Sequence, residues 1–233
     1  MKHYRPIVIM TQSRAFERDS SVLSLVHTPL ITTEALPFDE TVFRCHYDWL
    51  VLTSRNAVQH FLPHMKKARF DRVATIGRKT SERLEQEGLK IDFEPGDYSQ
   101  EGFLADFPAW HGTRILYPAS REARPLLHDH LVAAGCAVER LDLYRPVANE
   151  AYREEIQALL AQSPYGITFS SPSGVRAFMK WFTPQDLGNI TVVAIGQVTA
   201  DALGLYGVAS IQPGKETLEE MVELLEDRID GGV

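Results

Sequence analysis

The chain has 233 residues, of which 44% are hydrophobic and 24% are charged, a composition typical of a folded globular protein rather than a disordered or disulfide-stapled one. Its 24 basic and 31 acidic residues give a net charge of -7, which argues against nucleic acid or an anionic membrane surface as the main partner. No apolar run approaches the roughly 18 residues of a membrane span and the first residues do not resemble a secretion signal, so we expect a cytoplasmic protein.

Strand and helix patterns alternate through the first half of the chain. A short apolar strand at 6–10 is followed by a polar turn with an arginine and by a helical pattern that runs to residue 23. The stretch 27–38, "HTPLITTEALPF", lacks helical periodicity and predicts an extended connector. Two further pairs of strand and helix are then expected, "WLVLTS" before "AVQHFLPHM" and "RVATIG" before "SERLEQEG".

The second half follows the same order. A strand in "TRILYPAS" precedes a helical pattern, and "VERLDLYRPVAN" (138–149) predicts a second extended connector. Strands in "GITFSS" and "VVAIG" each precede another helical pattern. The last predicted helix, in "ETLEEMVELLEDRIDGG", starts with Thr217 and Glu220 at the spacing of a capping box.

These parallels are an internal repeat. "LTSRNAVQHF" (52–61) resembles "FSSPSGVRAF" (169–178), and "VATIGRKTSERLEQEG" (73–88) resembles "VVAIGQVTADALGLYG" (192–207). Two copies of one unit therefore fill the chain, and alternating strands and helices predict a parallel sheet flanked by helices in each. The fold class is α/β with two similar lobes. If both connectors cross between them, the second lobe is inserted into the first; the residues alone equally allow a simple tandem.

Several starts of predicted helices could bind anions. Ser171 and Pro172 fit an N-cap followed by proline at the first helical position, and Ser54 stands in the matching place of the other copy. Free backbone N–H groups at such starts attract anions without any net positive charge. Ordinary helix capping explains the same residues, so both interpretations stay open at this point.

Other classes of site find little support. The chain has neither of the glycine-rich nucleotide-binding motifs G-x-G-x-x-G and G-x-x-x-x-G-K-[ST], and no G-x-S-x-G nucleophile elbow. Neither the cysteines nor the paired histidines have the spacing of a metal site, and Pro63 interrupts the helix that would align the first histidine pair. These residues are Cys45, Cys136, His60, His64, His128 and His130. We therefore expect no metal.

One position breaks the internal symmetry. When Pro37 is matched to Pro146, the second connector has Tyr144 where the first has the apolar residues Ala35 or Leu36. A tyrosine on a connector between lobes could present its hydroxyl to a cleft, or it could simply pack its ring against the core.

Together these features resemble the uroporphyrinogen-III synthase family. The resemblance rests on six strings in the family's order, "LTSRNAV", "ATIGRKTSERLEQEG", "SQEGFLADF", "LDLYRPV", "TFSSPSGVRAF" and "VAIGQVTADAL". It implies a cofactor-free, monomeric lyase of tetrapyrrole (heme) biosynthesis, which closes hydroxymethylbilane into uroporphyrinogen III with loss of water and inversion of ring D. It also implies the inserted layout, with 1–35 and 150–233 in one lobe and 36–149 in the other.

The resemblance also implies roles for individual residues. Tyr144 becomes the general acid that assists departure of the substrate's hydroxyl group. The residues implied in binding the eight substrate carboxylates are Ser54, Thr80, Ser170, Ser171 and Thr199, with Arg14 and Arg121 as further candidates. The family often has Thr-Arg-Pro after its first strand, where this chain has Thr11, Gln12 and Ser13 before Arg14. The rival hypothesis is a non-catalytic bilobal module that binds a small polyanion.

Overall fold

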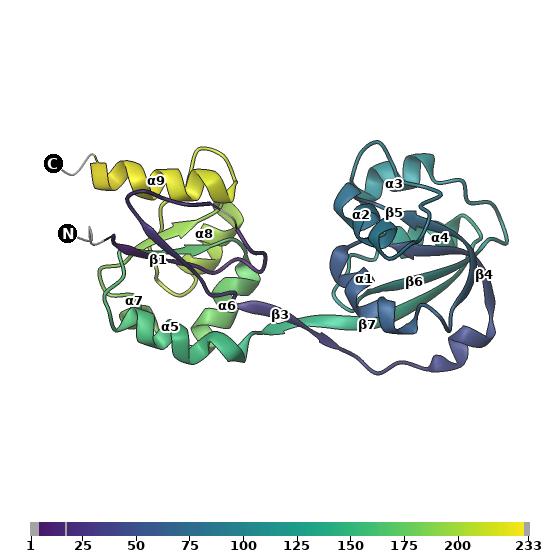
Figure 1. Ribbon diagram of the computed structural model, residues 1–233, viewed down its shortest axis with the longest axis horizontal. Coiled ribbons are helices and arrows are strands. Elements are labelled where there is room, and N and C mark those ends of the chain that lie inside the picture. The colour runs from purple at the N-terminus through teal and green to yellow at the C-terminus, as the bar shows by residue number, and fades with distance from the viewer. Residues whose placement is uncertain (1–4, 17, 231–233) are drawn as a thin grey trace. The chain divides into compact units, whose positions relative to one another are not determined.

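The computed structural model describes residues 5–16 and 18–230 of the chain (Figure 1). The chain divides into two compact units, and the first is discontinuous in sequence. Met1–Thr32 and Val147–Val233 form unit 1, and Thr33–Pro146 form unit 2. Each unit has its own predominantly parallel sheet with helices on both faces. The predicted α/β fold class is confirmed.

Unit 1 contains a four-stranded sheet in the order β2-β1-β8-β9. All neighbouring strands in it are parallel. The strands are β1 (Ile7–Met10), β2 (Ser24–His27), β8 (Gly166–Phe169) and β9 (Thr191–Ala194). The helices are α5 (Arg153–Leu160), α6 (Pro172–Trp181), α7 (Pro184–Leu187), α8 (Gln197–Gly204) and α9 (Leu218–Asp230), with a short 3-10 turn at Glu150–Tyr152.

Alternation along the strands of unit 1 creates two separate apolar layers. Ile9 of β1 faces the side that α5, α6 and α8 cover, whereas Val8 and Met10 face α9. Figure 1 shows α9, in yellow, on one side of the sheet and α5 and α6 on the other. The central strands β1 and β8 are buried on both faces, which explains their mostly apolar sequences.

Unit 2 contains a five-stranded sheet in the order β3-β7-β6-β4-β5. The strands are β3 (Ile31–Ala35), β4 (His46–Leu52), β5 (Arg69–Thr75), β6 (Arg114–Ser120) and β7 (Ala137–Ala148). Helices α1 (Arg55–Phe61) and α2 (Arg78–Gln86) cover one face, and α3 (Gln100–Asp106) and α4 (Leu126–Ala133) cover the other. Two short 3-10 helices, Glu40–Arg44 and Leu62–His64, complete the unit.

The internal repeat appears directly in the strand orders. The part β7-β6-β4-β5 of the second sheet repeats β2-β1-β8-β9 of the first, and these strands are parallel throughout. The matched strings "LTSRNAV" and "FSSPSGV" begin α1 and α6 after corresponding strands. Both expected connectors are extended, as β3 and β7, and the chain passes from one unit to the other within each of them.

Two expectations about local structure are wrong. The helical pattern expected after the polar turn with Arg14, as far as residue 23, is not realised: residues 15–16 and 18–23 contain no helix, whereas the second copy has α4 in the equivalent place. In this segment the Ser20 hydroxyl accepts the Leu23 N–H at 2.9 Å, a local bond that competes with helical pairing. At the start of α9, Thr217 accepts the Glu220 N–H at 3.2 Å, but the Glu220 carboxylate pairs with Lys215 at 3.2 Å instead of completing a capping box.

Candidate active site

The candidate residues of unit 2 follow the carboxyl ends of its parallel strands. Ser54 follows β4, Thr80 follows β5, Arg121 follows β6, and Tyr144 lies in the second half of β7. Because carboxyl ends of parallel strands meet at one edge of a sheet, all these residues belong to the same edge. This is the edge at which open α/β sheets generally bind ligands.

Tyr144 and Ser54 are in direct contact within unit 2. Tyr144 is only 6% exposed, and its hydroxyl lies 3.0 Å from the Ser54 hydroxyl, a bond in which either group can donate. Ser54 is also the N-cap of α1, as predicted, and accepts the Ala57 N–H at 3.1 Å. Burial raises the pKa of Tyr144 above its ordinary value, and the bond from Ser54 opposes part of that rise.

An imidazole covers the ring of Tyr144. The His60 and Tyr144 ring centroids are 4.8 Å apart with an interplanar angle of 7°, a stacked arrangement. The Nε2 atom of His60 lies 2.8 Å from the hydroxyl oxygen of Thr33 on β3. Burial lowers the pKa of His60 below its ordinary value. Sequence reasoning assigned no function to His60 or Thr33, because nothing in their local pattern indicates contacts between residues so far apart in the chain.

Arg121 is joined to Tyr144 through the backbone. The Arg121 N–H donates to the Tyr144 carbonyl at 2.8 Å, which extends the pairing of β6 with β7 beyond the end of β6. The exposed Arg121 side chain has its Nε atom 3.8 Å from the Asp142 carboxylate. This distance leaves the guanidinium weakly paired, so it can still take a second anion.

The two Gly-x-x-Thr turns have the same local geometry in the two units. Gly77 and Gly196 are the N-caps of α2 and α8, and Thr80 and Thr199 occupy the third position of those helices. Both glycines have extended backbones, so neither is required for a left-handed conformation. Thr80 is 5% exposed and Thr199 3% exposed, so both side chains are largely covered within their own units.

The candidates of unit 1 also follow strand ends. Ser170 and Ser171 follow β8, and Arg14 lies in the irregular segment after β1. Ser171 caps α6 by accepting the Gly174 N–H at 3.2 Å, and Pro172 is the first helical residue, as predicted. Arg14 is exposed. Among the described residues, no hydrogen bond links the side chains of Arg14, Ser170 or Thr199 to another candidate.

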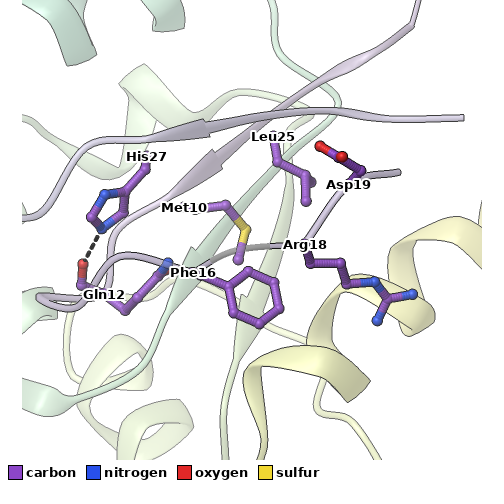
Figure 2. Close-up of a pocket in the computed structure, with 7 residues that line it drawn as sticks. All are labelled: Met10, Gln12, Phe16, Arg18, Asp19, Leu25 and His27. Carbon is purple, nitrogen blue, oxygen red and sulfur yellow. Dashed lines mark hydrogen bonds between the residues drawn. The ribbon is translucent and has the colours of Figure 1, made fainter. Parts of the chain in front are cut away.

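A separate pocket of about 420 Å³ lies at the carboxyl ends of β1 and β2 (Figure 2). Met10 and Leu25 form part of its apolar lining. Arg18 lines this pocket, but its guanidinium already pairs with the carboxylates of Glu223 and Glu226 on α9, at 3.1 and 2.8 Å. The described residues that line the pocket include none of the predicted substrate-binding residues and no free cation for a polyanionic ligand.

The described residues offer no group of three or more metal-binding side chains. No helix among them is long and apolar enough to cross a membrane. His60 and His64 are separated by the change from α1 to a 3-10 helix at Leu62, as Pro63 predicted. The histidine pair therefore does not form one ligand face.

Comparison with known proteins identifies the family. Residues 19–223 match the family described as uroporphyrinogen-III synthase HemD, which is well over half of the chain. The chain belongs to this family. The resemblance inferred from the six sequence strings is thereby confirmed.

Relatives of the uroporphyrinogen-III synthase family match at moderate identity. A putative uroporphyrinogen-III synthase of Methanothermobacter thermautotrophicus is 28% identical over 195 residues, covering 77% of each chain. The porphyrin biosynthesis protein HemD of Ruminiclostridium josui is 25% identical over 222 residues, covering 89% of this chain. This chain spans only 44% of the Ruminiclostridium protein.

Solved structures of the family have the same fold. The crystal structure of uroporphyrinogen-III synthetase from Helicobacter pylori 26695 matches with a TM-score of 0.66 and 22% identity, covering 96% of this chain and 99% of that one. A mutant uroporphyrinogen III synthase from the extremely thermophilic bacterium Thermus thermophilus matches with a TM-score of 0.54 and 19% identity, covering 97% and 99%. At these identities the likeness establishes the fold alone.

Proposed function

We propose that this chain is a uroporphyrinogen-III synthase that cyclises hydroxymethylbilane to uroporphyrinogen III, with loss of water and inversion of ring D. Family membership supports the proposal, and the single observation that carries it is the Tyr144 hydroxyl held by Ser54 at the carboxyl edge of the unit 2 sheet. A substrate whose own pyrrole nitrogen expels the hydroxyl group requires a proton donor and a mould, so the proposed reaction needs no metal or cofactor.

In the proposed mechanism Tyr144 protonates the departing hydroxyl group. The O–H bond of the phenol breaks as the substrate's C–O bond breaks, and water leaves. The resulting azafulvenium cation is attacked by the substituted carbon of ring D, which gives a spiro intermediate. The bond from that carbon to its original methylene bridge then breaks, and the bridge bonds to the free α-carbon of ring D, which leaves the ring inverted. The macrocycle loses one proton when it regains its aromatic pyrroles, and that proton restores the phenol, so the enzyme ends unchanged.

Ser54 supports this proton transfer. Its oxygen accepts the Ala57 N–H at 3.1 Å, which polarises its own O–H group. That O–H group is 3.0 Å from the Tyr144 oxygen and can donate to it as negative charge develops there. Burial alone would make Tyr144 a weaker acid, and the bond from Ser54 opposes this effect. Ser54 would therefore contribute more in the transition state than in the resting enzyme.

We further propose that the remaining candidates bind the substrate's acetate and propionate groups. Ser54 and Ser171 begin α1 and α6, and Thr80 and Thr199 lie in the first turns of α2 and α8, where backbone N–H groups are available. Ser170, Arg14 and Arg121 add a hydroxyl group and two exposed cations. The lobe bounds that the family resemblance implies, 1–35 with 150–233 and 36–149, remain part of this proposal.

The proposed enzyme works as a cytoplasmic monomer on a small-molecule substrate. The net charge of -7 argues against nucleic acid and anionic membranes as partners, since both repel such a protein. Local backbone donors can still bind carboxylates despite the net charge.

The deciding experiment supplies hydroxymethylbilane, oxidises the products and separates the porphyrin isomers. The free bilane closes by itself to the type I ring, so a type III product requires the enzyme. Tyr144→Phe should lower the rate of type III formation while substrate affinity changes little. Type I alone, formed at the uncatalysed rate, would refute the proposal. Substrate binding without turnover would favour a non-catalytic binding module.

A further inference from the structure

The stacked contact between His60 and Tyr144 restricts a motion of the phenol ring that the hydrogen bond to Ser54 leaves free. A tyrosine hydroxyl lies on the axis about which the phenol ring turns, so a hydrogen bond to that oxygen leaves the ring free to rotate. The phenolic O–H prefers the plane of the ring because its oxygen is conjugated with it. The orientation of the ring therefore sets the directions in which Tyr144 can deliver its proton.

His60 restricts this rotation. Its imidazole lies 4.8 Å from the phenol by ring centroids and is tilted from it by only 7°. A ring turning about its axis would collide with a flat neighbour at this distance, because aromatic faces already touch at about 3.5 Å. We propose that His60 is a positioning residue for Tyr144, which holds the plane of the phenol while Ser54 holds its oxygen.

The imidazole is itself held in place. Its Nε2 atom is 2.8 Å from the Thr33 hydroxyl oxygen on β3, and the β3 strand pairs with β7, which contains Tyr144. Helix α1 thus contacts Tyr144 twice, at its N-cap through Ser54 and near its end through His60. Two elements, α1 directly and β3 through His60, therefore fix the side chain of Tyr144 on β7.

The same contact keeps water from the phenol. Tyr144 is 6% exposed, and removal of a stacked ring would open one of its faces. Because burial raises the pKa of Tyr144, this opening should move its ionisation back toward the ordinary value near 10. Ionisation of Tyr144 is thus a readout of positioning that does not require turnover.

The inference rests on the proposed function, and four variants test it. His60→Ala removes the stacked ring, His60→Phe keeps a flat ring without the Thr33 bond, and Thr33→Val removes only the anchor. His64→Ala is the matched control, because His64 packs against Phe38 and Phe43 rather than Tyr144. Rates of type III formation give kcat and KM, and a titration at 295 nm, with Tyr144→Phe as reference, isolates the ionisation of Tyr144.

The expected result for His60→Ala is a fall in kcat of about tenfold or more with KM within about twofold, because misorientation of a catalytic group acts on the transition state. His60→Phe should restore most of kcat, Thr33→Val should show a smaller fall, and His64→Ala should match the parent. The phenol of Tyr144 should ionise at lower pH in His60→Ala only.

Two results would overturn the inference. One is a parental kcat in His60→Ala and Thr33→Val, and the other is a titration of Tyr144 that does not respond to loss of the His60 ring. If His60→Ala fails to fold, Thr33→Val decides the kinetic arm. If the parent protein forms only type I product, the proposed function fails, and the titration alone then decides whether His60 fixes the phenol.

Discussion

Replacing Ser54 with alanine should destabilise unit 2 in two ways at once. The hydroxyl caps α1 by accepting the Ala57 N–H at 3.1 Å, and loss of such a cap costs about 1 kcal/mol. The same hydroxyl is bonded to the buried Tyr144 hydroxyl at 3.0 Å, and leaving that group without a partner costs about another 1 to 3 kcal/mol. We expect a total loss of about 3 kcal/mol in the free energy of unfolding.

A double-mutant cycle separates the two contributions. In a Tyr144→Phe background, Ser54→Ala should cost only the cap, about 1 kcal/mol, which leaves a coupling energy of about 1 to 3 kcal/mol between the two side chains. Ser171→Ala is the control in unit 1, because Ser171 caps α6 through the Gly174 N–H at 3.2 Å without a tyrosine partner. It should cost about 1 kcal/mol in either background.

Urea unfolding provides the assay. Trp49 and Trp110 lie in unit 2 and Trp181 lies in unit 1, so fluorescence of single-tryptophan versions follows each unit separately. The slope of the free energy of unfolding against urea concentration must be the same in the parent and the variants before differences in midpoint are converted into free energies. If Ser54→Ala costs no more than Ser171→Ala and is additive with Tyr144→Phe, the assignment of Ser54 as the partner of Tyr144 is wrong.

Three further outcomes are expected. Thr28→Val should raise the free energy of unfolding by about 1 kcal/mol in a denaturation series, because the buried Thr28 hydroxyl has no hydrogen-bond partner among the described residues; a loss of stability would contradict this. Gly102→Ala should lower the urea midpoint of unfolding, because the added Cβ atom would collide with the Asp97 carbonyl oxygen. Gly204→Ala has open space around the added Cβ atom and should be neutral or stabilising. Burial lowers the pKa of His60, so its contribution to stability is complete above about pH 6.5 and is lost as pH falls through the folded-state pKa. The midpoint measured from about pH 7.5 to about pH 5 should therefore fall less in His60→Phe than in the parent, and identical profiles would refute this.

The features that sequence predicted correctly depend on neighbours in the chain. Helix capping by Ser54 and Ser171 requires only a hydroxyl three residues before a free N–H group, so a local pattern suffices. The parallel sheets follow from alternating apolar and helical segments, and the duplication doubles the evidence for each element. The same local reasoning failed at residues 15–23, where Arg18 pairs with distant Glu223 and Glu226 and the described part of the segment is irregular.

The contacts of Tyr144, in contrast, join residues that are far apart in the chain. Its bond to Ser54 joins residues 90 positions apart, and the bond that fixes His60 on Thr33 joins residues 27 apart. Asymmetry between the two connectors marked Tyr144 as unusual, but no local pattern distinguishes His60 from other half-buried histidines. His60 therefore had no place among the sequence-based candidates.

By itself, the sequence determined the α/β class, the duplicated units, the helix starts at Ser54 and Ser171 and the family, because each is encoded in short segments repeated in order along the chain. Only the tertiary structure decided which side chains meet. Pairing of β3 with β7 and packing of α1 beside them place Thr33, His60, Ser54 and Tyr144 together, and that placement depends on contacts closed over long stretches of chain. The proton donor could be suspected from one connector, but its partners emerge only when the sheet is assembled.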